Sequence, residues 1–244
     1  SLIPFLPSNS IMSDTATLTF GDSNYPINIL TGTEGEKALD IRQMRKDSGL
    51  ITYDDGYGNT GSCESTVTFI DGDKGILRYR GYDISELAQK SNFLEVCLLL
   101  LDGELPTARK LSEFEDKISS FQNLPSEVLH AVQSVPPSTH PMGSLASGLH
   151  ALGGACSHLC TNDRAKDLGN FDDAAALIIA ALPAIAAATH RQKTKDNLCP
   201  PNNSLNYCEN FLSMMFAKDG DAPINPSLSK ALDLIFLLHA DHEQ

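Results

Sequence analysis

The sequence lacks the features that mark several classes of protein. Its six cysteines include no Cys-x-x-Cys pair, and nothing at its start reads as a secretory signal. We therefore expect reduced thiols and a cytoplasmic protein. The first eleven residues carry no charge and the first basic residue is Lys37, which excludes an Arg-rich transit peptide. No GxxxxGK(S/T) sequence occurs, so a P-loop for nucleotide phosphates has no support.

Basic residues are also scarce. The chain has 31 Asp and Glu but only 18 Lys and Arg, which gives a formal net charge of −13. Such a surface repels phosphate backbones and anionic lipids, so we expect no nucleic-acid partner and no membrane partner. An anionic substrate is still compatible, because a few converging cations outweigh a distant negative field. The basic clusters at 42–46 and 191–195 are interpreted as solvated surface.

Low-complexity tracts are absent, and 41% of the 244 residues are hydrophobic, so the composition predicts a packed globular core. The segment 171–189 is almost uncharged beyond Asp172 and Asp173 and could be mistaken for a membrane span. It is mainly alanine, which gives little transfer energy, and Pro183 interrupts it. We therefore predict a buried core helix there.

The order of patterns along the chain predicts a mainly α protein with a small β-rich N-terminal region. A hairpin is expected over 17–30, with Pro26 confining the second strand to an edge, and another over 65–80. Helices follow, among them one capped by Ser85, one over 142–159 and a last one that runs from Pro226 into His239 and His242. The expected divisions are 1–11 (a leader or cloning remnant, disordered), 12–60 (the β-rich region) and 61–244 (the α-helical domain).

Three ordered segments resemble one known family. They are Gly61-Ser62-Cys63-Glu64-Ser65 leading to Ile70-Asp71-Gly72-Asp73 and Tyr79-Arg80-Gly81-Tyr82, then 205–216 (LNYCENFLSMMF), then 237–244 (LLHADHEQ). The set resembles the citrate synthase family, nearest to its bacterial, hexamer-forming branch. The similarity covers the chain from about residue 16 to its end. It implies a truncated citrate synthase large domain as the fold.

The resemblance also implies an activity. Citrate synthases are acyltransferases that condense acetyl-CoA with oxaloacetate and water to citrate and CoA, in the tricarboxylic acid cycle, without a metal or other cofactor. Proton abstraction next to a thioester requires a carboxylate base, a donor for the enol oxygen and an acid that polarises the ketone. In the family these are an Asp and two His residues downstream of the segment that ends at Gln244. We therefore assign no catalytic residue here and expect the 244-residue chain alone to be inactive.

One substrate-binding residue carries over from the family motif. His242 matches the family histidine that forms a hydrogen bond with oxaloacetate, and an imidazole is a suitable directional donor for a carboxylate or ketone oxygen. His239, three residues earlier, is assigned a second-shell or structural role, because helical histidines are usually satisfied within the core.

Two metal-like patterns have more ordinary interpretations. His239, Asp241, His242 and Glu243 have ligand-type side chains, but the spacing is not His-Glu-x-x-His and the sequence shows no convincing third ligand, so no metal site is predicted. Cys156, His158 and Cys160 also lie close in sequence. Because the two cysteines would share a helix face and the histidine would not, buried core thiols are expected.

Several properties stay open at this stage. The alternatives are a 2-methylcitrate synthase or a non-catalytic remnant of a split or degraded gene. The family works as homo-oligomers, dimers or hexamers. Bacterial members often bind NADH at an allosteric site with basic and His residues in a stretch that aligns with 119–123, which here reads Ser-Ser-Phe-Gln-Asn. Because those cations are missing, we expect no regulation by NADH.

Overall fold

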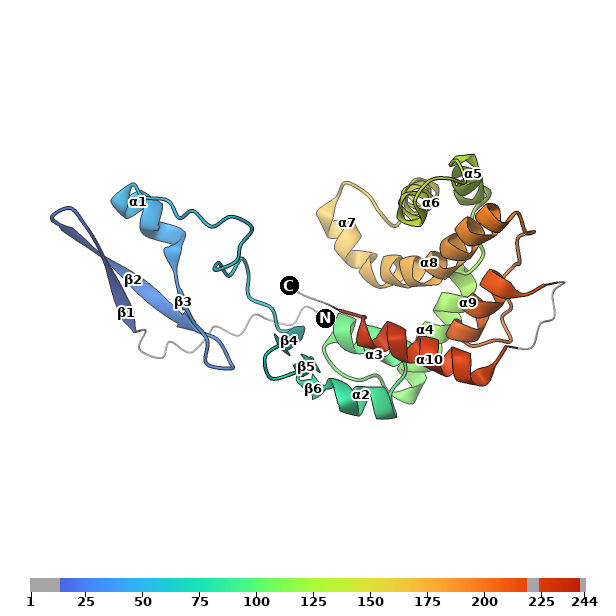
Figure 1. The fold of residues 1–244 in the computed structure, drawn as a ribbon, viewed down its shortest axis with the longest axis horizontal. Coiled ribbons are helices and arrows are strands. Elements are labelled where there is room, and N and C mark those ends of the chain that lie inside the picture. Colours follow the sequence, from blue (N-terminus) through green and yellow to red (C-terminus); the bar gives the residue numbers. More distant parts are fainter. Residues whose placement is uncertain (1–13, 219–223, 242–244) are drawn as a thin grey trace. The chain divides into compact units, whose positions relative to one another are not determined.

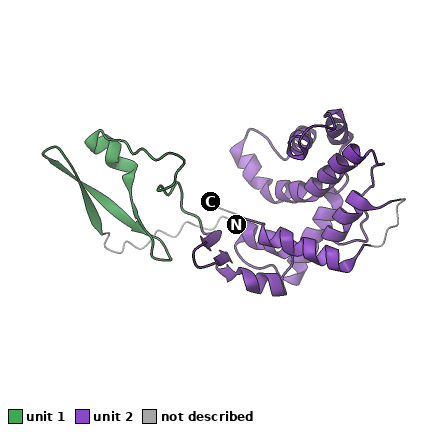
Figure 2. Cartoon of the chain, viewed as in Figure 1, with its two compact units in different colours: residues 1–65 green, residues 66–244 purple. Residues whose placement is uncertain are grey.

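The computed structural model describes residues 14–218 and 224–241, and the chain divides into two compact units, residues 1–65 and 66–244 (Figures 1 and 2). The division falls five residues after the boundary expected at 60/61. The expected leader, residues 1–11, lies outside the described residues.

The first unit is built on a small antiparallel sheet of order β1-β2-β3. Its elements are β1 (Thr15–Phe20), β2 (Ser23–Thr31), β3 (Lys37–Leu39), the short 3-10 helix η1 (Ile41–Gln43) and α1 (Met44–Ser48). Phe20 pairs with Ser23, so Gly21 and Asp22 form a two-residue turn. Gly21 has a φ of +62°, a conformation that glycine adopts without steric cost. The predicted N-terminal hairpin is confirmed.

The prediction that Pro26 lies on an edge strand is wrong, because β2 is the central strand of this sheet. Pro26 is opposite Thr17 of β1, whereas β3 pairs only with Ile29–Thr31. Backbone groups of alternate residues point to the same side of a strand. Since the Asn28 carbonyl accepts a bond from Asp40 N on the β3 side, Pro26 directs its nitrogen to that side too, beyond the end of β3. The missing N–H therefore costs no ladder bond.

The second unit is mainly α-helical, as predicted. A short antiparallel sheet of order β4-β5-β6 leads into nine helices among the described residues. The elements are β4 (Thr68–Asp71), β5 (Ile76–Tyr79), β6 (Tyr82–Asp83), α2 (Ile84–Lys90), α3 (Phe93–Asp102), α4 (Ala108–Phe121), α5 (Ser126–Ser134), α6 (Pro141–Ala155), α7 (Arg164–Gly169), α8 (Phe171–Thr194), α9 (Tyr207–Phe216) and α10 (Pro226–Leu238).

Helix α8 forms the centre of this unit, and α4, α5, α6, α7 and α9 all contact it (Figure 1). By length and composition it could cross a membrane, but half of its most apolar 18-residue window is buried inside the protein. Pro183 and Ile185 are both buried, although they point to nearly opposite sides of the helix. The predicted core helix is confirmed. It extends five residues beyond the expected end at Thr189.

Several helix ends differ from their predicted positions. The N-cap of α2 is Asp83, whose carboxylate accepts a bond from Ser85 N, so Ser85 is not the cap. Asn206 caps α9 through a capping box with Glu209, so the helix within the segment 205–216 begins at Tyr207. In both cases the side chain that accepts from the free N–H groups of the first turn sets the start of the helix.

The predicted helix over 142–159 ends early. Helix α6 stops at Ala155, and Cys156 is its C-cap. Cys160 is exposed and Cys156 is only partly buried, so the interpretation of both as buried core thiols is wrong. All six cysteines, which lie within the described residues, are free.

Small residues in α6 permit a close helix contact at one position. A Cβ atom built on Gly148 would lie 2.6 Å from Cγ2 of Ile185 in α8 and 3.0 Å from Cγ2 of Val132 in α5. Gly153, on the exposed side of the same helix, has no atom within 4 Å of such a Cβ. The helices therefore approach closely at Gly148 and not at Gly153.

We predict opposite effects for alanine at these two glycines. Gly148→Ala should lower the free energy of unfolding by about 1–3 kcal/mol, because the new methyl group overpacks the contact between α5, α6 and α8. Gly153→Ala should leave stability unchanged or raise it by about 0.5–1 kcal/mol, through the better helix propensity of alanine. Urea denaturation of the full-length protein measures both. Equal effects of the two substitutions would contradict the proposed contact.

Candidate functional site

The predicted substrate-binding segment follows the C-terminal end of α10. Asn225 caps the start of this helix and Pro226 occupies its first turn, and the helix ends at Leu238 with His239 as C-cap. The predicted continuation of the helix through His239 is therefore wrong. His242 lies outside the described residues, so the structure gives no position for it. The described chain ends one residue earlier, at Asp241.

Tyr79 of β5 holds the turn that follows α10. Its side chain is completely buried. The hydroxyl lies 2.9 Å from the carbonyl oxygen of Asp241 and 3.2 Å from that of Leu238, and it accepts a bond from Asp241 N at 3.4 Å. Burial raises the pKa of Tyr79, and the nearby Asp241 carboxylate adds to the rise, so the phenol stays protonated and keeps its donor at neutral pH.

Thr68 of β4 makes a second connection to the same turn. Its hydroxyl donates to the Asp241 carboxylate. Thr68 and Tyr79 are directly opposite each other in the β4–β5 ladder, so their side chains stand on the same face of the sheet. Two adjacent positions of one hairpin therefore contact one residue of the turn.

His239 is exposed, and its Nδ1 lies 2.8 Å from the carbonyl oxygen of Ile235, one helical turn earlier. In this geometry Nδ1 is the donor. The expectation that this ring would be satisfied within the core is wrong, because its partner is the exposed backbone of its own helix. Its assigned second-shell role stays a prediction.

Asp233, on the same helix, was not singled out in the sequence. Its Oδ1 accepts a bond of 3.1 Å from Phe93 N at the start of α3 and lies 3.8 Å from Sγ of Cys208 in α9. Burial raises the pKa of Asp233. Its position one turn before the buried Leu237 is a signal that sequence reasoning could have used, because a carboxylate on an apolar helix face needs a partner.

The two thiols near Asp233 are structural. Burial, with the charge of Asp233 second, raises the pKa of Cys97 to about 12 and that of Cys208 to about 12. A thiol with such a pKa carries almost no thiolate at neutral pH and is a poor nucleophile.

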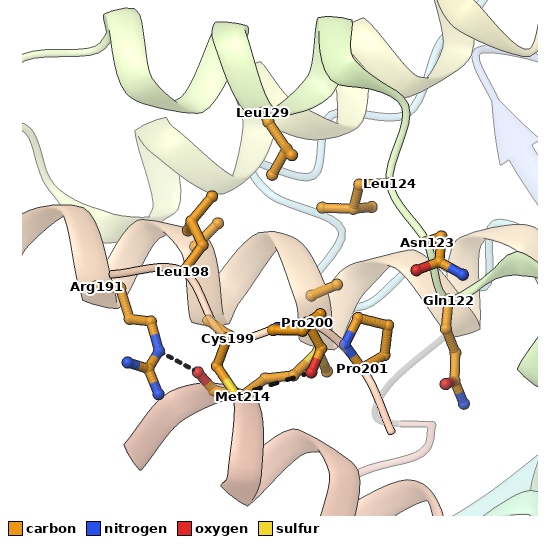
Figure 3. Close-up of a pocket in the computed structure, with 13 residues that line it drawn as sticks. Gln122, Asn123, Leu124, Leu129, Arg191, Leu198, Cys199, Pro200, Pro201 and Met214 are labelled. Carbon is orange, nitrogen blue, oxygen red and sulfur yellow. Dashed lines mark hydrogen bonds between the residues drawn. The ribbon is translucent and has the colours of Figure 1, made fainter. Parts of the chain in front are cut away.

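A cavity of about 210 Å³ lies between α8, α9 and the loop that contains Cys199 (Figure 3). Its walls are mostly apolar, with Leu124, Leu129 and Met214 among them. Gln122 and Asn123 also line it. They belong to the stretch 119–123 on which the expected lack of NADH regulation depends.

The charged residue of this cavity wall, Arg191, is 5% exposed, so the interpretation of 191–195 as solvated surface is wrong for it. Its guanidinium donates to the carbonyl oxygens of Met214 at 2.5 Å, Asn197 at 2.8 Å and Ala217 at 2.8 Å. The bond to Met214, drawn in Figure 3, and the bond to Ala217 satisfy carbonyl groups at the end of α9. Because the guanidinium donors are used by backbone carbonyl groups, we assign Arg191 a structural role rather than a ligand-binding one.

Other ligand patterns find little support in the structure. Among residues 14–218 and 224–241, no group of three His, Cys, Asp or Glu side chains could hold a metal ion, so Cys156, His158 and Cys160 do not form one. His242 and Glu243 lie outside this range. Gly56-Tyr57-Gly58-Asn59-Thr60-Gly61 has the GxGxxG spacing. It lies in a loop between α1 and β4, without the preceding strand and following helix of a dinucleotide site.

These features define a class of protein: a mainly α-helical domain that begins with a short β-hairpin. The turn after its last described helix is hydrogen-bonded to that hairpin. A family model described as "Citrate synthase, C-terminal domain" matches residues 56–244. A citrate synthase of Corynebacterium glutamicum is 40% identical over 94% of this chain and 52% of its own length. The chain belongs to the citrate synthase family, and it spans about half the length of this relative.

Solved structures give the same result. The citrate synthase of Pyrobaculum aerophilum matches 88% of this chain and 50% of its own, with 28% identity and a TM-score of 0.64. That of Thermotoga maritima matches 79% and 48%, with 27% identity and a TM-score of 0.65. A ternary complex of the Thermoplasma acidophilum citrate synthase with carboxymethyl coenzyme A and oxaloacetate matches 76% and 47%, with 26% identity and a TM-score of 0.66.

We predict that Arg191 is essential to the stability of this region. Arg191→Met should lower the free energy of unfolding by at least about 2 kcal/mol, because it leaves buried carbonyl groups at the end of α9 without donors. Arg164→Met on α7, where the side chain is exposed, is the matched control and should change stability by less than about 0.5 kcal/mol. Urea midpoints of the full-length proteins compare them, and equal midpoints would refute the prediction.

Proposed function

We propose that the full-length protein is a citrate-forming acyltransferase, which condenses acetyl-CoA with oxaloacetate and water to give citrate and CoA. The observation that carries the proposal is the family match over 56–244, together with the 40% identity to a citrate synthase. The matching fold of an enzyme solved with carboxymethyl coenzyme A and oxaloacetate supports the substrate pair. Acetyl-CoA is a substrate in this proposal, and no cofactor is required.

The contribution of this half of the protein is to bind the keto acid. In the proposal, His242 donates a hydrogen bond to oxaloacetate, and the base and electrophilic donors belong to the second half. Removing a proton next to a thioester carbonyl needs these groups together, since each acid–base contribution amounts to about a hundred- to ten-thousand-fold in rate. The 244-residue chain then holds a binding group without the groups that perform the reaction.

The location and assembly of the protein belong to the same proposal. A cytoplasmic enzyme fits the thiols, which are unpaired in the structure. A homo-oligomer fits the apolar side chains that α10 exposes, Leu228 at 58% and Ile235 at 52%, because contacts with further protein would cover such groups.

The first test of the proposal compares two lengths of the chain. CoA release from acetyl-CoA and oxaloacetate, followed with a thiol reagent, should be rapid with the full-length protein and indistinguishable from background with residues 1–244. Propionyl-CoA in place of acetyl-CoA should be the poorer substrate. Turnover by the short chain, or a preference for propionyl-CoA, would contradict the proposal.

The second test concerns His242. In the full-length enzyme, His242→Gln should raise the KM for oxaloacetate by about 10- to 100-fold, the factor for a hydrogen bond to a charged group. The KM for acetyl-CoA should change little. The exposed His130 of α5 provides the control, since His130→Gln should leave both constants unchanged. An unaltered oxaloacetate KM in His242→Gln would remove His242 from the site.

A further inference from the structure

Helices α6 and α8 run in opposite directions along their contact. Gly148 of α6 lies against Ile185 of α8, since a Cβ atom built on the glycine would be 2.6 Å from Cγ2 of the isoleucine. Near the C-terminal end of α8, Lys193 Nζ donates to the carbonyl oxygens of Pro137 at 2.9 Å and Thr139 at 2.5 Å, just before α6 begins. Residue numbers therefore fall along α6 as they rise along α8.

Two buried hydroxyl groups lie one helical turn from this contact. Ser144 precedes Gly148 by four residues, which places both on one face of α6. Thr189 follows Ile185 by four residues and shares a face of α8 with it in the same way. Because the chain directions are opposite, both steps lead toward the same end of the contact, so the two hydroxyl groups belong to one layer. Ser144 is 1% exposed and Thr189 is 3% exposed.

Neither hydroxyl group has a hydrogen-bond partner within residues 14–218 and 224–241. The neighbouring hydroxyl of Ser147, also on α6, donates to the carbonyl oxygen of Gly143 at 2.9 Å, which is the usual local partner of a helical serine. Ser144 and Thr189 lack this local bond. Since a buried polar group without a hydrogen bond costs free energy, a partner from outside the chain would stabilise the pair.

Gln192 adds a third polar atom to this layer. It follows Thr189 by three residues, on the same face of α8. Its Nε2 donates to the carbonyl oxygens of Gln133 at 2.9 Å and Val135 at 2.8 Å, at the end of α5, and these bonds fix the orientation of the amide. Its Oε1 is buried and accepts no bond from the described part of the chain. Two hydroxyl groups and one amide oxygen match the partners that a buried water molecule has.

We propose that α6 and α8 enclose a binding site for one water molecule, held by the hydroxyl groups of Ser144 and Thr189 and by Oε1 of Gln192. Water fits because it is donor and acceptor at once: it accepts from the hydroxyl groups and donates to the amide oxygen. It also spans a separation that is too long for a direct bond. The contact at Gly148, one turn away, leaves no room for a methyl group without a shift, so the space suits a ligand as small as water.

The first test is a high-resolution crystal structure of the full-length protein. We expect density for one buried water within about 3.2 Å of at least two of the three polar atoms. A structure without such a water would overturn the proposal. This site stabilises the pairing of two helices, so the test is independent of the reaction that the enzyme catalyses.

The second test uses the sign of a stability change in the full-length protein. Thr189→Val and Ser144→Ala each remove one hydroxyl group. Either substitution leaves the water short of a partner, so the melting temperature should fall by about 2–4 °C. The double variant should lose less than the sum of the two single losses, because both act through the same water. Ser147→Ala, whose hydroxyl is bonded to its own helix, is the control and should change the melting temperature by less than about 1 °C.

The opposite sign would contradict the water site. If the two hydroxyl groups have no partner in solution, Thr189→Val removes an unsatisfied polar group and the melting temperature rises. A rise, an unchanged value or strictly additive losses in the double variant would each overturn the proposal. If Thr189→Val does not fold, the sign of the change in Ser144→Ala and the crystal structure of the wild-type protein decide.

Discussion

The second unit depends on the burial of α8. Eleven of its residues are buried, and most of those are alanines. Because each alanine buries little apolar area, such a helix is stabilised only when neighbours approach its backbone closely on several sides. The absence of a side chain at Gly148 permits this approach by α6, and Pro183 is tolerated because the helix is held by tertiary contacts rather than by propensity. The positions of α4, α5, α6 and α9 follow from this requirement.

The packing of these helices buries several of their ends, and polar side chains form hydrogen bonds with the backbone groups there. Arg191 satisfies carbonyl groups at the end of α9, Asp233 accepts from the first N–H of α3, and Tyr79 serves the end of α10. Each of these is a side chain on one element bonded to the backbone terminus of another. Helix termini are where backbone groups lack partners, so these bonds fix the orientation of helices that apolar packing leaves adjustable.

The sequence predicted the helical class, both hairpins and the core helix, because each depends on local pattern. Its errors concern residues whose environment is set from far away. Pro26 was placed on an edge because the short reach of β3 was not visible in its neighbourhood. Arg191 was assigned to solvent because its carbonyl partners lie up to 26 residues away. For the site, the family motif supplied His242 and His239, but no local pattern indicates the bonds from Tyr79 and Thr68 to Asp241, which span 162 and 173 residues.

A turn that directly follows a helix lacks the regular hydrogen bonds that fix the helix itself. The helix determines where the chain leaves, but beyond the C-cap no regular hydrogen bond determines its direction. Here the carbonyl of Leu238 and both backbone groups of Asp241 meet one phenol, which is donor and acceptor at once. A phenylalanine would pack in the same place without giving the turn a direction. The hydroxyl is therefore the part of Tyr79 that holds the turn after α10, and the ring is the part that belongs to the core.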